Sequence, residues 1–66
     1  MQIQVNGKPT TLAENSSLSN LISQLALGGA KIAVEMNREI VPRSEYDHRI
    51  LNEGDVVEIV QAIGGG

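Results

Sequence analysis

The chain has 66 residues, a net charge of −3 and no cysteine. This length predicts one small domain, and the missing cysteines exclude disulfides, thiolate metal sites and a cysteine nucleophile. The five basic residues are scattered, which argues against binding to nucleic acid or to an anionic membrane. The chain has a single histidine, His48, and this argues against a histidine-based metal site. No apolar run approaches the roughly 20 residues that span a bilayer, and the first residues show no signal-peptide pattern. We therefore expect a soluble, cytoplasmic protein.

The first thirteen residues predict a β-hairpin. Residues 1–5, MQIQV, alternate apolar and polar side chains, as a half-buried strand does. Asn6-Gly7 follows, a pair that tolerates positive φ and favours a tight hairpin turn. The returning strand contains Pro9, which cannot donate a ladder hydrogen bond, so this strand should lie at a sheet edge or begin after the proline.

The next segment, NSSLSNLISQLAL, changes to a helical period. Its apolar residues recur at i, i+3, i+4 and i+7 and predict one buried stripe made of Leu18, Leu21, Ile22 and Leu25. Ser16 or Ser17 can serve as the N-cap. Asn20 stands where a capping box prefers Glu or Gln, so the box is expected to be incomplete. Gly28-Gly29 is expected to end the helix.

The second half of the sequence predicts further strands. Residues 31–37 alternate again, and residues 39–43 form a short strand that Pro42 ends. The stretch SEYDHRIL has no clean period. It is interpreted as a helical turn followed by an extended piece that places Ile50 and Leu51 inward.

The last strand, residues 56–60, completes the pattern. Val57 and Ile59 face one way, and the intervening residues face the other. The order is therefore hairpin, helix and two or three more strands, and one helix covers a single sheet face. The prediction is an α+β, ubiquitin-like β-grasp roll, with a mixed four- to five-stranded sheet on one main helix. We expect residues 1–61 to form this domain and residues 62–66 to form a flexible glycine tail.

Two motifs carry a resemblance to a known family. The segments AVEMNREIVPR and EGDVVEIVQAIGGG, with a terminal Gly65-Gly66, resemble the sulfur carrier proteins of thiamine biosynthesis, the ThiS family. The resemblance runs from Met1 to Gly66. Gly64 adds a third glycine to the diglycine tail and leaves the implied chemistry unchanged. Arg43 belongs to the resembling segment, and the sequence gives no physical account of its role.

The resemblance implies that the α-carboxylate of Gly66 is the reactive group. A ThiF-type adenylyltransferase would activate it with ATP, a protein persulfide would supply sulfur, and a ThiG-type thiazole synthase would consume the thiocarboxylate. The protein would then be a co-substrate, with no catalytic residue and no bound cofactor or metal. If residues 62–66 are extended, they reach roughly 17 Å beyond the fold. Gly64 and Gly65 lack Cβ atoms, so they can pass through a narrow channel.

A docking surface is expected on the last strand. The side chains of Val56, Glu58 and Val60 face away from the helix, and Ala62 and Ile63 follow at the root of the tail. An apolar patch with an acidic rim is typical of a partner-binding site. A strand partly covered by its own neighbours is the competing interpretation.

Two other functions are compatible with the pattern. The small subunit of molybdopterin synthase shares the carrier mechanism, but it is usually longer. A β-grasp domain can also be a non-covalent binding module, and some of these modules bind RNA. The net negative charge and the absence of Phe and Trp argue against RNA here.

Overall fold

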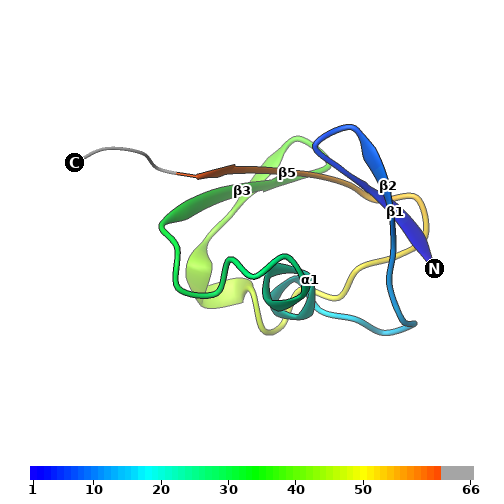
Figure 1. Cartoon of the computed structure of the whole chain (residues 1–66), viewed down its shortest axis with the longest axis horizontal. Coiled ribbons are helices and arrows are strands. Elements are labelled where there is room, and N and C mark those ends of the chain that lie inside the picture. The colour runs from blue at the N-terminus through cyan, green and yellow to red at the C-terminus, as the bar shows by residue number, and fades with distance from the viewer. Residues whose placement is uncertain (62–66) are drawn as a thin grey trace.

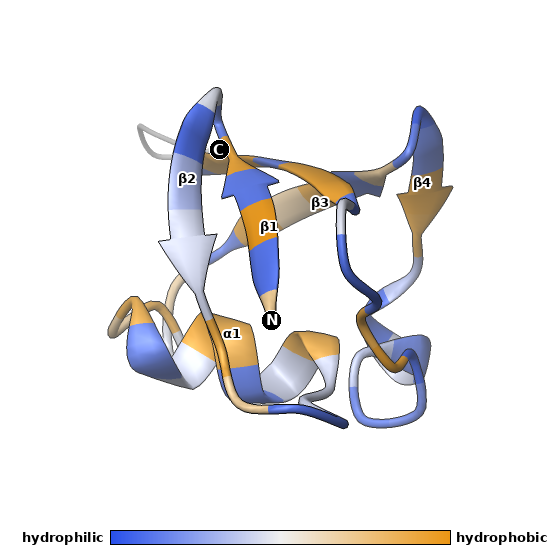
Figure 2. Cartoon of the chain, turned by 90° about the vertical axis from the view of Figure 1, so that its right-hand side faces the viewer, coloured by the Kyte–Doolittle hydropathy of each residue, from blue (hydrophilic) through white to orange (hydrophobic). Residues whose placement is uncertain are grey.

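The computed structural model describes residues 1–61. It is a two-layer arrangement in which one sheet lies over one α-helix (Figures 1 and 2). Along the chain the elements are β1 (Gln2–Val5), β2 (Lys8–Thr11), α1 (Leu18–Gln24), β3 (Ile32–Met36), β4 (Glu39–Val41), the 3₁₀ helix η1 (Arg43–Glu45) and β5 (Val56–Gln61). None of the helices in this part of the chain is long and apolar enough to cross a membrane.

The five strands are ordered β2-β1-β5-β3-β4. β5 pairs parallel with β1 and antiparallel with β3, so the sheet is mixed, and the last strand is its central one. The predicted α+β roll with a mixed sheet on one helix is confirmed. The expected edge position of the second strand is also confirmed, because β2 pairs only with β1 among the described strands and Pro9 lies within it.

The β1–β2 hairpin turns at Asn6 and Gly7, with φ angles of 52° and 82°. Both lie in the left-handed region, which Gly adopts freely and Asn tolerates better than most residues. This agrees with the turn predicted from the Asn-Gly pair.

Helix α1 begins with a complete capping box, contrary to the expectation from sequence. The Asn20 backbone N–H donates to Ser17 Oγ at 3.1 Å, and the Ser17 backbone N–H donates to Asn20 Oδ1 at 2.9 Å. The shorter Asn side chain therefore does what Glu or Gln usually does at this position. Ser17 is the N-cap, and Ser16 Oγ instead donates to the Ala13 carbonyl at 2.7 Å.

The predicted helix end was wrong. α1 stops at Gln24, and the residue that reverses the backbone is Ala26, with φ 61°. The Gly28-Gly29 pair lies beyond this point and does not end the helix. The early stop also leaves Leu25 outside the buried stripe, 37% exposed.

The core fills the space between the inner sheet face and α1. Its buried members come from every strand except β2, from α1 and from two loop positions: Ile3, Val5, Leu12, Leu18, Leu21, Ile22, Val34, Met36, Val41, Leu51, Val57 and Ile59. Of the two residues expected to point inward after η1, Leu51 is buried and Ile50 is 44% exposed. The reason is alternation, because adjacent residues of an extended segment face opposite ways.

Candidate functional site

β5, the strand that precedes residues 62–66, is held on both sides. β3 pairs with β5 over its whole length, from Ile32 opposite Gln61 to Met36 opposite Val57. β1 pairs with β5 at only two positions, Gln4 opposite Val56 and Val5 opposite Val57. The last residues of β5 therefore extend beyond the end of β1.

Two asparagines in left-handed conformation complete the hydrogen bonding of β5. On the β1 side, the Ile59 N–H donates to Asn6 Oδ1 at 2.8 Å, and Asn6 Nδ2 donates to the Ile59 carbonyl at 3.2 Å. On the β3 side, the Val56 N–H donates to Asn37 Oδ1 at 3.0 Å, and the Asn37 N–H donates to the Val56 carbonyl at 2.8 Å. These contacts fix the position of β5 relative to β1 and β3.

The sheet face turned away from α1 is apolar along β4 and β5. Val56 is 43% exposed, Val60 is 67% exposed, and Ile40 on β4 is 69% exposed. We call this surface the outer patch and define it by six residues, Ala33, Glu35, Ile40, Val56, Glu58 and Val60. The strand register places them on one face, because Ala33 is opposite Val60, and Glu35 lies between Glu58 and Ile40.

Two carboxylates face each other across the outer patch. Glu35 and Glu58 are directly opposite in the β3–β5 register, and neither forms an ion pair with another residue of the described range 1–61. Like charges directly opposite each other on neighbouring strands destabilise a sheet. They border a hollow of about 700 Å³ that is also lined by Asn37, Arg38 and Val56. The pair therefore does not serve the stability of the fold.

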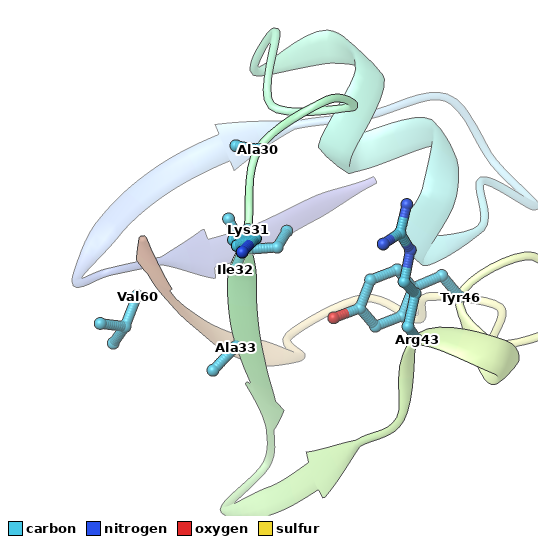
Figure 3. A pocket seen from close by; sticks show the side chains of 7 residues that line it. All are labelled: Ala30, Lys31, Ile32, Ala33, Arg43, Tyr46 and Val60. Atoms are coloured by element: carbon cyan, nitrogen blue, oxygen red, sulfur yellow. The ribbon is translucent and has the colours of Figure 1, made fainter. Parts of the chain in front are cut away.

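A second hollow lies where β5 ends. It has a volume of about 320 Å³, and we call it the tail-side cavity, lined by Ala30, Lys31, Ile32, Ala33, Arg43, Tyr46 and Val60. Figure 3 shows Arg43 and Tyr46 on one side of the cavity, Lys31 and Ile32 at the start of β3, and Val60 on the other side. The cavity thus combines two cationic side chains with apolar walls.

The chain is similar to known proteins over its whole length. The ThiS family matches residues 3–66. A crystal structure of thiamine biosynthesis protein ThiS from Geobacter metallireducens superposes with a TM-score of 0.84 at 38% identity, and the match covers 100% of both chains. The chain belongs to the ThiS family. The β-grasp prediction is confirmed by the same superposition.

Curated relatives fall into two sizes. Sulfur carrier protein ThiS from Escherichia coli is 33% identical over 66 residues, which cover 100% of both proteins. A thiazole synthase from Paramagnetospirillum magneticum is 39% identical over 66 residues, which are 100% of this chain and 20% of that protein. The chain thus spans about a fifth of the length of that thiazole synthase. ThiS is a family of sulfur carriers in thiamine biosynthesis rather than of enzymes.

The structure describes three of the residues that the sequence predicted for the functional site. Val56, Glu58 and Val60 are exposed on the outer patch, as the alternation indicated. The other predicted positions, Ala62, Ile63, Gly64, Gly65 and Gly66, lie outside the described residues. His48 is exposed, and no cluster of metal-binding side chains occurs among residues 1–61.

Sequence reasoning missed five residues of this region. Ala33, Glu35 and Ile40 were not assigned to the outer patch, although their alternation with the buried residues of β3 and β4 was the available signal. Lys31 and Arg43 were not connected, because no local pattern shows that they line one cavity.

Proposed function

We propose that this protein carries sulfur as a thiocarboxylate on the α-carboxyl group of Gly66. The match to the ThiS family over residues 3–66 is the observation that supports this proposal most directly. The absence of cysteine supports it too, because no side chain of the sequence offers a thiol for sulfur.

A carboxylate is a poor electrophile, so it must be activated first. In the proposed reaction a carboxylate oxygen of Gly66 attacks the α-phosphorus of ATP in a ThiF-type adenylyltransferase, and pyrophosphate leaves. The terminal sulfur of a protein persulfide then attacks the acyl carbon and displaces AMP, which gives an acyl disulfide. A thiol reduces this S–S bond, so the thiocarboxylate is released and a disulfide remains on the donor side.

The proposed acceptor of the sulfur is a ThiG-type thiazole synthase. A thiazole synthase contains a segment that matches this whole chain, and the remaining four-fifths of that protein lie outside the match. A carrier-like segment within a synthase supports the idea that the two act together.

We further propose that the outer patch docks onto the adenylyltransferase. Exposed Ile40, Val56 and Val60 supply an apolar centre, and Glu35 and Glu58 supply charge within it. Burial of these side chains would hold the domain outside the partner while the proposed tail, residues 62–66, enters the partner's active site.

The test is the intact mass after incubation with ATP, a ThiF-type adenylyltransferase and a persulfide donor. We expect one oxygen to be replaced by sulfur at the C-terminus. A chain lacking Gly66 should keep its melting temperature and lose the mass change. As a matched control, Gly29→Ala changes an exposed loop glycine, where an added Cβ meets nothing within 4 Å, and should load normally.

Two results would contradict the proposal. Sulfur gain by the chain without Gly66 would place the acceptor atom elsewhere. A protein that binds the adenylyltransferase but never gains sulfur would be a non-covalent docking module instead.

A further inference from the structure

The tail-side cavity is not used by the docking contacts described above, apart from Ala33 and Val60, which it shares with the outer patch. We propose that it receives an acidic side chain from a loop of the adenylyltransferase, held by Lys31 and Arg43. This inference rests on the proposed carrier function and adds the chemistry of one contact between the partners.

The position of the cavity supports this role. Val60 lines it, and the next residue, Gln61, is paired with Ile32, which also lines it. The cavity therefore lies beside the point where β5 ends, as Figure 3 shows for Val60 and Ile32. A partner group bound here would contact the domain next to the entrance of the tail.

The charges of the cavity are not satisfied within the domain. Lys31 and Arg43 are exposed, and neither side chain forms an ion pair or a hydrogen bond with another residue in the range 1–61. Arg49, by contrast, lies 3.8 Å from Glu45. The whole chain carries eight acidic and five basic residues, so its net charge is negative. Lys31 and Arg43 therefore form a local positive charge on a negatively charged domain. An acidic partner group complements them.

The backbone holds Arg43 in place before any partner binds. Pro42, with φ −65°, starts η1, and the Tyr46 N–H donates to the Arg43 carbonyl at 3.2 Å. The Ser19 N–H of α1 donates to the Tyr46 carbonyl at 3.0 Å, which ties this turn to the helix. A guanidinium binds a carboxylate with two parallel hydrogen bonds, and the half-buried Tyr46 ring and Ile32 reduce water access around such a pair.

The test uses charge reversal and steady-state ATP–pyrophosphate exchange by a ThiF-type adenylyltransferase. The variants are Lys31→Glu, Arg43→Glu and both together. Lys8→Glu is the matched control, because Lys8 is also exposed and lies on β2 outside the cavity. We expect the double variant to raise the KM for the carrier about tenfold at low salt, with kcat within about twofold. The single variants Lys31→Glu and Arg43→Glu should raise this KM by smaller factors. Lys8→Glu should raise it less than about twofold. Added salt should reduce each of these differences in KM.

Several results of this assay would contradict the proposed role of Lys31 and Arg43. An equal KM for the double variant and Lys8→Glu would overturn the proposal. A raised KM for ATP instead of the carrier would assign the cations to nucleotide phosphates and overturn it as well. A lower kcat with unchanged KM would indicate a role in aligning the tail, again against docking. Absence of exchange with the unaltered protein would refute the carrier function itself. Circular dichroism melting curves of each variant are the control for folding.

Discussion

The two faces of β5 differ in how far their side chains are buried in the domain. Val57 and Ile59 point toward α1 and are 0% and 8% exposed, whereas Val56 and Val60 point away and are 43% and 67% exposed. The residue types are nearly the same, so hydrophobicity alone does not separate them. The inner valine and isoleucine therefore stabilise the domain, whereas the outer valines keep an apolar surface that remains exposed after folding.

Truncation of the inner face should have the largest effect on stability. Val57→Ala removes two carbon atoms from a fully buried site, so we expect a loss of about 2–3 kcal/mol in the free energy of unfolding, measured by urea denaturation. Val56→Ala, the same change one residue away, should cost less than about 0.5 kcal/mol. Equal losses for the two variants would break the comparison between the faces.

The hydrogen-bonded edge of β5 should show an intermediate effect. Asn6→Ala leaves the Ile59 N–H without its side-chain acceptor and puts Ala at φ 52°, so we expect a loss of about 1–2 kcal/mol. Asn6→Asp keeps the acceptor and loses only the donor to the Ile59 carbonyl, so its loss should be smaller. Hydrogen exchange of the Ile59 amide measures the effect locally. Unchanged protection in Asn6→Ala would show that the side chain does not hold this strand.

The outer face should show the smallest effect on stability and a visible effect on function. For Val60→Ala we expect unfolding free energy within about 0.5 kcal/mol of the unaltered protein. The KM for the carrier in adenylyltransferase exchange should rise about threefold to tenfold, because the two lost carbon atoms no longer become buried against the partner. Thr11→Ala, on edge strand β2, is the control and should leave KM unchanged. A Val60→Ala variant with normal KM would remove Val60 from the docking surface.

The sequence was informative wherever a structural feature depends on neighbouring residues. Alternation assigned both faces of β5, and Asn6-Gly7 located the hairpin turn.

Features that depend on tertiary context were missed. Glycine normally signals a helix end, yet here Ala26 adopts the left-handed conformation and Gly28 does not end the helix. The capping box was predicted to be incomplete because Glu or Gln is usual at the third helical position, whereas Asn20 reaches the Ser17 N–H in the folded geometry. The tail-side cavity requires the β3–β4 hairpin and η1 to form first, so no local pattern could reveal it.

The position of β5 also determines when the domain can fold during synthesis. β5 is the last of the described strands in sequence and the central one in the sheet, and its parallel neighbour β1 is the first of them. Such long-range pairing forms late, because the intervening loop must close first. A nascent chain that still lacks residues 56–61 has β1–β2 and β3–β4 as two separate hairpins with nothing between them. Incomplete translation products that lack β5 should therefore stay unfolded and be exposed to proteases.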